Sequence, residues 1–371
     1  MSVLTSLDAV DDVVYQREDV FELAGRELAD LQHGLLRDAV LHHWKACEPY
    51  RRYAAVDGWT PAMLDRPAAI ASIPLLPASV FKRRAVLSCD RSDVVRICAS
   101  SGTQGSSSRV FRDGTTLERF LGSIDQGADL ALPERAAPHR LFVLGPDTEE
   151  AADLWFSYVL SIVDLLHPTE FFVRDGVLEL DALMEALRPD TGERPVVIGP
   201  PVLVRDVALA LRDSDVSCRL GEREGQVVTA GGWKRFGNEA LPREEFEELV
   251  TAAFGLTGSA PVRDCFNAVE LNTVLFECEA RGKHVPAWLH ASARDPVSMH
   301  PLRPGDLGVL AFCDSLPTSY PGFVLTDDLG SVSAEGVCPC GRASRVLTVT
   351  RRVESVEARG CALKMDKAVT R

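Results

Sequence analysis

Apolar residues recur at helical spacing near the start of the chain. Between about Val20 and Ala55 they fall three or four positions apart, as in an amphipathic α-helix: Leu23, Leu28, Leu31, Leu35, Leu36, Val40, Leu41 and Trp44. The segment 73–82 contains Pro74 and Pro77, which favour an extended backbone in the residues before them. The pattern therefore predicts an α-helical beginning followed by an extended connection.

Beyond residue 90 the pattern changes to short apolar runs separated by polar loops. It predicts buried strands at 94–99, 140–145, 195–199 and 227–232, and helices at 151–166, 204–211 and 243–254. Strands that alternate with helices are typical of a mainly parallel sheet, whose ligands bind at the carboxyl ends of the strands. From about residue 271, Pro and Gly occur every few residues, which predicts a smaller β-rich portion.

Composition narrows the class of protein. A chain of 371 residues, 46% of them hydrophobic, can bury one large core or two medium ones. Its net charge of −14 argues against nucleic acid or an anionic membrane as a partner, because both require a basic surface. No apolar run is long enough to span a bilayer, and the beginning lacks the apolar segment of a signal peptide. We therefore expect a soluble cytoplasmic protein whose ten cysteines are reduced or bound to metal.

The stretch from Ser100 to Arg109 follows the first predicted strand and contains two glycines, five serines and no large apolar side chain. Such a loop can present hydroxyl and backbone N–H groups to a phosphate. It lacks the Gly-Lys-Ser/Thr ending of a Walker loop and the glycine spacing of dinucleotide folds. We predict a phosphate loop, with a surface turn as the alternative. Its members are Ser101, Gly102, Thr103, Gln104, Gly105 and Ser106.

Gly231 and Gly232 directly follow another predicted strand. Two glycines there let a flat ligand lie against the backbone, and Trp233 can stack on that ligand or cover it. The alternative is an ordinary turn at the end of a strand.

Two carboxylates also follow apolar runs. Glu270 comes after Phe266–Val269 and is a natural Mg²⁺ ligand if it lies near bound phosphates. Asp328 closes Thr326-Asp327-Asp328, where a carboxylate can accept both hydroxyls of a ribose. The alternatives are a solvated glutamate and an Asp-rich turn.

Four residues of the β-rich portion predict a structural zinc site: Cys278, His284, Cys338 and Cys340. Their spacing is Cys-x5-His followed by Cys-Pro-Cys-Gly. Three thiolates and one imidazole make the closed tetrahedral shell that Zn²⁺ prefers. His290 and Cys265 are the substitutes if one of the four is not a ligand. Unrelated buried cysteines and a redox pair are the alternatives.

Cys361 lies near the carboxyl end among basic residues, namely Arg351, Arg352, Arg359, Lys364 and Lys367. Positive neighbours favour the thiolate, which is a nucleophile when it is accessible. The alternative is an inert cysteine in a basic tail.

Taken in order, these segments resemble the motifs of the adenylate-forming superfamily of acyl-CoA synthetases. Ala99–Gly105 is similar to its phosphate loop, and Phe266–Glu270 to the motif whose glutamate holds Mg²⁺. The segment 326–328 resembles the motif whose aspartate binds ribose, and 350–360 resembles the hinge motif, with Arg351 in its nucleotide-contacting place. Gln104 and Asn267 stand where the family has threonine and glycine, and Ser106 where a lysine often follows.

The resemblance implies an α/β fold like the large N-terminal domain of these enzymes, with mainly parallel sheets flanked by helices. It implies ATP and Mg²⁺, with Glu270 as the Mg²⁺ ligand and Asp328 on the ribose. It also implies nucleotide contacts from the phosphate loop, Gly231, Gly232, Trp233, Asn267 and Arg351.

Two subfamilies are closer still. The zinc-like cysteines occur in relatives of phenylacetate-CoA ligase, whereas Gly-Gly-Trp-Lys at 231–234 and Gly-Cys-Ala at 360–362 resemble LuxE-type acyl-protein synthetases. Only residues 361–371 follow the hinge-like segment, so we expect the usual C-terminal domain and its catalytic lysine to be missing. Lys234, Lys364 and Lys367 are then the candidates for that positive charge, and we assign it to Lys234. In LuxE-type proteins a cysteine near the end accepts the acyl group, a role that falls to Cys361.

We therefore expect ATP-dependent activation of a carboxylic acid as an acyl-adenylate, followed by acyl transfer to a thiol, either Cys361 or an external one. The partners are the acid and an acyl acceptor such as a reductase, a carrier protein or CoA. One alternative is a ligase that forms acyl-CoA, acyl-carrier or amide products, with Cys361 structural. Another is a non-catalytic nucleotide- or acyl-binding protein. We expect the acyl-activating domain to span residues 1–350 and the hinge and tail 351–371.

Overall fold

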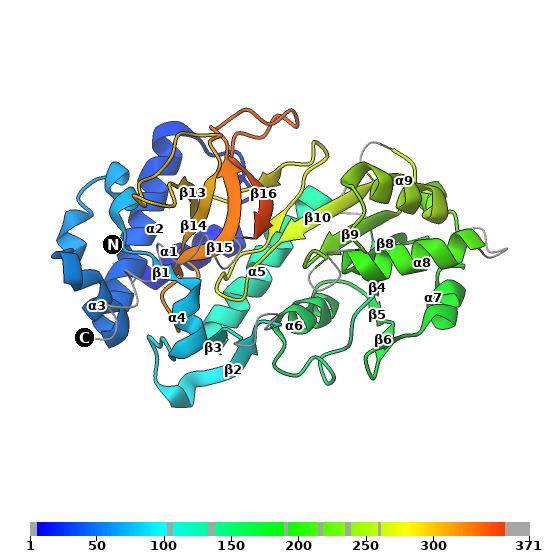
Figure 1. Ribbon diagram of the computed structural model, residues 1–371, viewed down its shortest axis with the longest axis horizontal. Coiled ribbons are helices and arrows are strands. Elements are labelled where there is room, and N and C mark those ends of the chain that lie inside the picture. The colour runs from blue at the N-terminus through cyan, green and yellow to red at the C-terminus, as the bar shows by residue number, and fades with distance from the viewer. Residues whose placement is uncertain are drawn as a thin grey trace.

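The computed structural model describes residues 6–101, 107–132, 138–188, 192–213, 218–233, 239–258 and 261–352. Helices at one end, an antiparallel sheet in the middle and a parallel sheet at the other end make up the chain (Figure 1). The mixed α/β class predicted from the sequence is confirmed.

The chain begins with three helices, α1 (Ser6–Gln16), α2 (Gly25–Ala46) and α3 (Glu48–Ala54). Helix α2 buries one side, with Leu28, Leu35 and Val40 inside, as the spacing predicted. The predicted single helical stretch is interrupted, because Pro49 lies in the first turn of α3 and starts a new helix. Short 3-10 helices lie at Ala55–Asp57, Pro61–Met63, Pro67–Ser72, Arg91–Asp93, Ile162–Leu165 and Leu220–Arg223.

The parallel sheet has the strand order β11-β10-β9-β8-β4-β5. Its strands are β4 (His139–Val143), β5 (Thr169–Phe171), β8 (Arg194–Gly199), β9 (Gln226–Ala230), β10 (Val262–Phe266) and the antiparallel β11 (Leu275–Phe276). Helices α8 (Pro201–Asp213) and α9 (Arg243–Phe254) cover it (Figure 1), and α7 (Leu180–Ala186) and the β6–β7 hairpin (Val173–Arg174, Val177–Leu178) lie nearby. All of β9 is buried, as expected for a central parallel strand, and the prediction of a mainly parallel sheet is confirmed.

The antiparallel sheet has the strand order β12-β16-β15-β14-β13, with β1 parallel to β15. Its strands are β1 (Leu76–Pro77), β12 (Lys283–His284), β13 (Leu289–Arg294), β14 (Gly308–Asp314), β15 (Phe323–Val332) and β16 (Val346–Arg352). The sheet therefore draws its later strands from the predicted β-rich portion. In the part of the chain that the structure describes, no helix is both long and apolar enough to cross a membrane.

Helix α5 (Gly114–Ala131) connects the two sheets. At its first turn, the Thr116 hydroxyl accepts a hydrogen bond from the backbone N–H of Thr318, between β14 and β15, at 3.0 Å. Further along α5, Gly127 faces β11, and a Cβ at this glycine would lie 2.4 Å from the ring of Phe276. Glycine is therefore required for α5 to pack this closely against β11.

Three local predictions are wrong. The strand β2 (Val94–Ala99) forms as predicted, but its partners are β3 (Arg109–Asp113) and a single bridge from Ala99 to Leu154. Most of β2 is not buried, since Val95 is 68% exposed and only Cys98 is fully covered. Residues 78–83 form the helix α4 (Ala78–Arg83) rather than extended chain, because Pro77 precedes the helix and buried Phe81 anchors it. Residues 151–154 are not helical: the segment accepts a hydrogen bond from the Ala99 N–H, and α6 (Trp155–Ser161) begins only after it.

Candidate active site and metal centre

The carboxyl ends of β9 and β10 lie side by side and bring two of the predicted segments together. Cys265 of β10 is the register partner of Ala230 of β9, so the turn that begins at Gly231 lies beside the loop that begins at Asn267. The edge formed by such strand ends is where ligands bind in parallel sheets. The structure therefore places Gly231 and the Glu270 loop (residues 267–273) at one edge.

Both the backbone conformation at position 231 and the side chain packed against it require a glycine. Gly231 has a φ of +79°, and a Cβ would lie 2.6 Å from the ring of Phe156 on α6. Gly232 also has a positive φ, +61°, but faces open space. Trp233 lies edge-to-face with Phe246 of α9 at 5.7 Å, with Arg205 of α8 5.6 Å above its ring. Open space beside the backbone is thus found at Gly232, and the Trp233 ring packs against the two helices.

The side chain of Asn267 is held by three hydrogen bonds within the protein. Its Oδ1 accepts from the indole N–H of Trp155 at 2.5 Å. Its amide nitrogen donates to the carbonyls of Leu271 and Thr273, at 3.3 and 2.8 Å. The described contacts of Asn267 therefore shape the Glu270 loop, and its predicted contact with the nucleotide stays a prediction.

Arg112, on β3, holds the same loop from the other side. Its Nη2 donates to the carbonyl oxygens of Val269, at 2.6 Å, and Leu271, at 3.3 Å, which flank Glu270 in sequence. Its Nε donates to Asn272 Oδ1 at 3.3 Å, and its guanidinium lies 3.7 Å from the centre of the Trp155 ring. The Arg112 side chain is fully buried.

Glu270 is 6% exposed, which is unusual for a single carboxylate. Burial lowers the pKa of the Arg112 guanidinium, but Tyr320, Cys98 and, to a smaller extent, the Glu270 carboxylate outweigh it, so that this pKa is raised. Glu270 is the only acidic residue from 267 to 273. The loop thus carries one buried carboxylate, and a buried cation binds the backbone on either side of it.

The Ser/Gly loop is anchored at both of its described ends. The backbone N–H of Ser100 donates to the Ser108 carbonyl at 3.0 Å, and the Ser108 N–H donates to the Ser100 hydroxyl at 2.9 Å. Ser101 is exposed at the beginning of the loop. The remaining predicted members, Gly102 to Ser106, lie outside the described residues.

Asp328 and Arg351 lie on adjacent antiparallel strands. Asp328 of β15 is the register partner of Arg352, and Leu329 is the partner of Arg351, so the two predicted residues are one position apart. Next to them, Asp327 pairs with Lys82 of α4, whose Nζ lies 3.5 Å from Oδ2. The predicted ribose ligand is therefore part of a charged region at the end of the antiparallel sheet.

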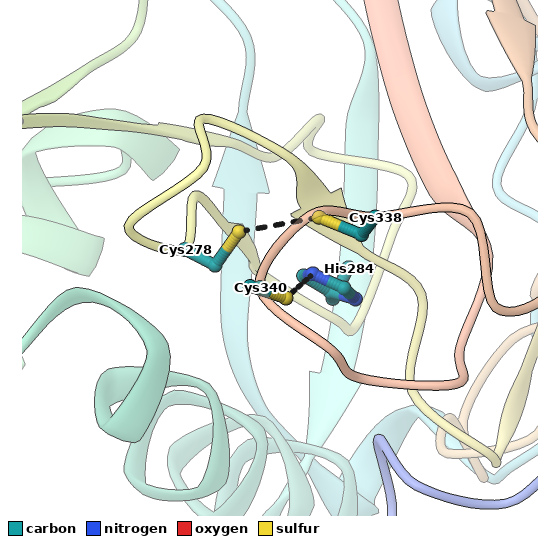
Figure 2. Close-up of side chains that lie close together, drawn as sticks. All are labelled: Cys278, His284, Cys338 and Cys340. Atoms are coloured by element: carbon teal, nitrogen blue, oxygen red, sulfur yellow. Dashed lines mark hydrogen bonds between the residues drawn. The ribbon is translucent and has the colours of Figure 1, made fainter.

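The four predicted zinc ligands lie together (Figure 2). Their ligand atoms are all within 4.8 Å of one another, with 3.6 Å between the sulfurs of Cys278 and Cys338 and 3.2 Å between Cys340 Sγ and His284 Nε2. A tetrahedral zinc shell places its sulfur atoms about 3.8 Å apart, given Zn–S bonds of about 2.3 Å. The Cys₃His set therefore fits Zn²⁺ in both donor type and spacing, and neither His290 nor Cys265 belongs to it.

Two tight turns bring the four side chains together. In the first, the Cys278 N–H donates to the Gly282 carbonyl, and in the second, the Gly341 N–H donates to the Cys338 carbonyl. A Cβ at Gly282 would lie 3.1 Å from Cys338 Sγ, so glycine lets the second turn approach the first. His284 Nδ1 lies 2.8 Å from the Ser344 hydroxyl, which orients Nε2 toward the sulfurs.

Burial favours the uncharged forms of most of these groups. It raises the pKa of Cys278, raises that of Cys338 to about 12, and lowers that of His284 to about 4. The pKa of Cys340 is lowered: burial raises it, but hydrogen bonds from Arg342 outweigh that effect. A neutral imidazole is the form that binds a metal ion, and buried thiolates require a nearby cation.

A family model described as "Acyl-protein synthetase, LuxE" matches residues 2–370. The chain belongs to the LuxE acyl-protein synthetase family. It is 33% identical over 362 residues to a long-chain-fatty-acid–luciferin-component ligase of Aliivibrio fischeri, and 32% identical over 363 residues to one of Vibrio harveyi. Both alignments cover 97% of this chain and 94% of the relative. As a member of this family, the protein is a ligase.

Solved structures of 2-hydroxyisobutyryl-CoA ligase have the same fold as this LuxE family member. One, an open conformation in complex with 2-HIB-AMP and CoA, has a TM-score of 0.72 at 14% identity and covers 90% of this chain and 72% of that chain. Another, in the thioesterification state, has a TM-score of 0.73 at 15% identity, with 91% and 70% covered. The fold expected from the motif resemblance is therefore confirmed.

Two functional residues predicted for this LuxE family member, Lys234 and Cys361, lie outside the described residues. Arg112 and Trp155, by contrast, were not predicted to act on the Glu270 loop. The Trp155 ring is buried. The sequence neighbours of Arg112, Phe111 and Asp113, gave no clear signal that it is a buried cation.

Proposed function

We propose that this LuxE family member uses ATP to convert a carboxylic acid into an acyl-adenylate and then transfers the acyl group to a thiol. The observation that carries the proposal is the Glu270 loop beside the Gly231 turn. There the loop that carries the buried Glu270 leaves β10 beside the glycine turn that leaves β9, at the edge where parallel sheets bind ligands.

In the first half-reaction a carboxylate oxygen of the acid attacks the α-phosphorus of ATP. A P–O bond forms, and the bond from that phosphorus to the leaving pyrophosphate breaks. We assign Ser101–Ser106 to the β- and γ-phosphates, Gly231–Trp233 and Asn267 to the nucleotide pocket, and Asp328 with Arg351 to the ribose side. We assign to Lys234, which follows this segment in the sequence, the positive charge on the leaving phosphate.

Glu270 is the residue assigned to hold Mg²⁺. A magnesium ion bound there supplies positive charge that offsets the charge of the ATP phosphates. Glu270 suits Mg²⁺ because it offers one carboxylate in a buried loop, and carboxylate oxygens are the ligands that Mg²⁺ takes from proteins.

In the second half-reaction a thiolate attacks the acyl carbonyl carbon, a thioester forms, and AMP leaves with the oxygen that joined it to the acyl group. We assign this nucleophile to Cys361. Splitting one condensation into two displacements lowers the barrier of each. The thiol loses its proton before it attacks, and the basic residues near Cys361 in the sequence favour that loss.

We further propose a long-chain fatty acid as the acid. The support is the printed activity of the two relatives, each a long-chain-fatty-acid–luciferin-component ligase that aligns over nearly the whole chain. The Cys₃His cluster is assigned a structural zinc ion, which holds the two turns of the β-rich portion together and takes no part in either half-reaction.

Labelled fatty acid and ATP test both halves in one experiment. Wild-type protein is expected to release pyrophosphate only with acid present and to retain acyl label after denaturation. Cys361→Ala is expected to keep pyrophosphate release but to retain no label, whereas Cys89→Ala, a half-buried control, retains it. Label that remains on Cys361→Ala contradicts the assignment of the nucleophile. Transfer of label to CoA instead supports an external thiol.

A further inference from the structure

The guanidinium of Arg112 is fully buried, and the hydrogen bonds described for it go to neutral oxygen atoms rather than to a carboxylate. Its Nη1 has no hydrogen-bond partner among the described residues, and no carboxylate pairs with it bidentately there. A buried cation of this kind destabilises a fold relative to an apolar side chain of similar size. Its presence in the core therefore calls for a reason other than stability.

The contacts of Arg112 converge on the Glu270 loop. Nη2 is shared between the carbonyls on either side of Glu270, at 2.6 and 3.3 Å, and it also donates to the Tyr320 hydroxyl at 3.3 Å. Nε donates to Asn272 in the same loop. Two backbone carbonyls held by one amino group fix the peptide units from which the Glu270 side chain projects.

Trp155 completes the arrangement from a third part of the chain. Its ring face supports the Arg112 guanidinium at 3.7 Å, a cation–π contact, while its N–H donates to Asn267 at the start of the loop. Arg112 itself lies on β3, the strand that leaves the Ser/Gly loop. One side chain thus joins the strand after the phosphate loop to the loop that carries the proposed Mg²⁺ ligand.

We infer that Arg112 is a positioning residue, which holds Glu270 in the geometry that binds Mg²⁺. Because Arg112 lies on β3, it also fixes the position of the Glu270 loop relative to the strand that follows the Ser/Gly loop. The inference rests on the proposed function for the role of Glu270, but the contacts it invokes are those of the protein alone. Arg112 touches neither the acid nor ATP in this account. It acts through the backbone of the Glu270 loop.

Magnesium titrations of acid-dependent pyrophosphate release test this role. Arg112→Lys keeps the charge but cannot span two carbonyls and Asn272 at once. It is expected to raise the Mg²⁺ concentration at half-maximal rate by about 10- to 100-fold, as loss of an outer-shell partner typically does. Arg96→Lys is the matched control, since Arg96 also lies over an aromatic ring, Tyr158 at 3.9 Å, but its described hydrogen bond is to Ala152.

A double-mutant comparison distinguishes a positioning role of Arg112 from a general loss of protein stability. In a Glu270→Gln background, Arg112→Lys is expected to shift the Mg²⁺ dependence no further, because the residue through which it acts is already changed. If Arg112→Lys does not fold, Tyr320→Phe replaces it, because it removes one hydrogen-bond acceptor of Arg112 Nη2. It is expected to raise the Mg²⁺ concentration at half-maximal rate by a smaller factor. The inference is overturned if Arg112→Lys changes the Mg²⁺ dependence no more than Arg96→Lys does. It is also overturned if Arg112→Lys still changes that dependence in the Glu270→Gln background.

Hydrogen exchange of the unliganded protein tests the positioning independently of catalysis. The amides of Leu271 and Asn272 donate to the Ala268 carbonyl and to Asp314 Oδ2, each at 2.9 Å, and report on the loop. They are expected to exchange faster in Arg112→Lys and unchanged in Arg96→Lys. If wild type shows no acid-dependent pyrophosphate release, the proposed function is wrong, and exchange still decides the role of Arg112. Unchanged exchange in Arg112→Lys contradicts that role.

Discussion

The indole N–H of Trp155 donates a hydrogen bond to Asn267 Oδ1 at 2.5 Å, across 112 positions of sequence. This contact ties α6, which follows the parallel strand β4, to the loop that follows β10. Since the same ring supports Arg112, two long-range contacts meet at one side chain. The shape of the Glu270 loop is therefore determined by residues far from it in sequence.

Trp155→Phe is expected to keep the ring under Arg112 but to leave Asn267 Oδ1 without its donor. Loss of a buried hydrogen-bond partner costs about 1–3 kcal/mol, which urea unfolding measures. Trp59→Phe is the control, because the Trp59 N–H donates to Ser72 at 3.3 Å, a longer bond. Equal losses in the two variants would contradict a special role for the Trp155 contact.

Zinc is expected to copurify in one equivalent and to stabilise the fold. Cys278→Ser and Cys338→Ser are expected to lose the metal, measured by elemental analysis, and to melt at lower temperature, because a structural metal contributes folding free energy. Cys265→Ala, which removes a half-buried thiol outside the cluster, is expected to keep the metal. Wild-type protein without zinc, or zinc lost equally from Cys265→Ala, would show the assignment to be wrong.

Gly231→Ala is expected to destabilise the protein more than Gly232→Ala. Both residues have positive φ, which costs an L-residue about 1–2 kcal/mol, but only at position 231 does the new methyl group meet the Phe156 ring. Phe156→Ala in the Gly231→Ala background is expected to recover part of the loss, as measured by urea unfolding. If the two glycine variants are equally stable, the Phe156 contact is not the constraint.

Asp314 is expected to make stability fall as pH rises from about 4 to about 6. Burial raises its pKa from 3.8 to about 6, so between these values the folded chain binds a proton that the unfolded chain has released. A proton that binds only to the folded state favours folding at the lower pH. This contribution to stability is lost as pH rises through about 6. Asp314→Asn should remove this component of the slope.

Asp295→Asn is the control for that titration. Hydrogen bonds from the Ser298 backbone and side chain lower the pKa of this exposed carboxylate, so its contribution has the opposite sign and is lost as pH falls below its ordinary range. Denaturant unfolding at several pH values measures both variants. A slope that Asp314→Asn leaves unchanged would contradict the assignment to Asp314.

Much of the fold follows from local pattern. Helix α9 begins and ends at the residues that the pattern predicted, 243 and 254, since Pro242 precedes it and Gly255 adopts a left-handed conformation after it. The zinc-like cluster was also predicted, because thiolate and imidazole spacing within two short turns is visible in the chain. The helix limits and each of the two turns depend on residues close together in sequence, although the two turns are about 60 positions apart.

Other features depend on partners that local pattern does not reveal. The run 94–99 has the apolar composition of a buried strand, yet it lies in a two-stranded sheet with one face open. Segment 151–154 was predicted helical, but it forms a turn whose Asp153 carbonyl accepts a hydrogen bond from Ala99, some fifty positions earlier. The contacts of Arg112 could not be predicted for the same reason, since the carbonyls that it binds lie about 160 positions away in the sequence.

Oxygen transfer from the acid to AMP tests the acyl-adenylate most directly. A fatty acid labelled with ¹⁸O in its carboxylate is incubated with ATP and wild-type protein, and the AMP is examined by mass spectrometry. Attack of the carboxylate on the α-phosphorus, followed by thiol attack on the acyl carbon, predicts AMP that carries one ¹⁸O. Unlabelled AMP, or ¹⁸O found in inorganic phosphate with release of ADP, would contradict the account.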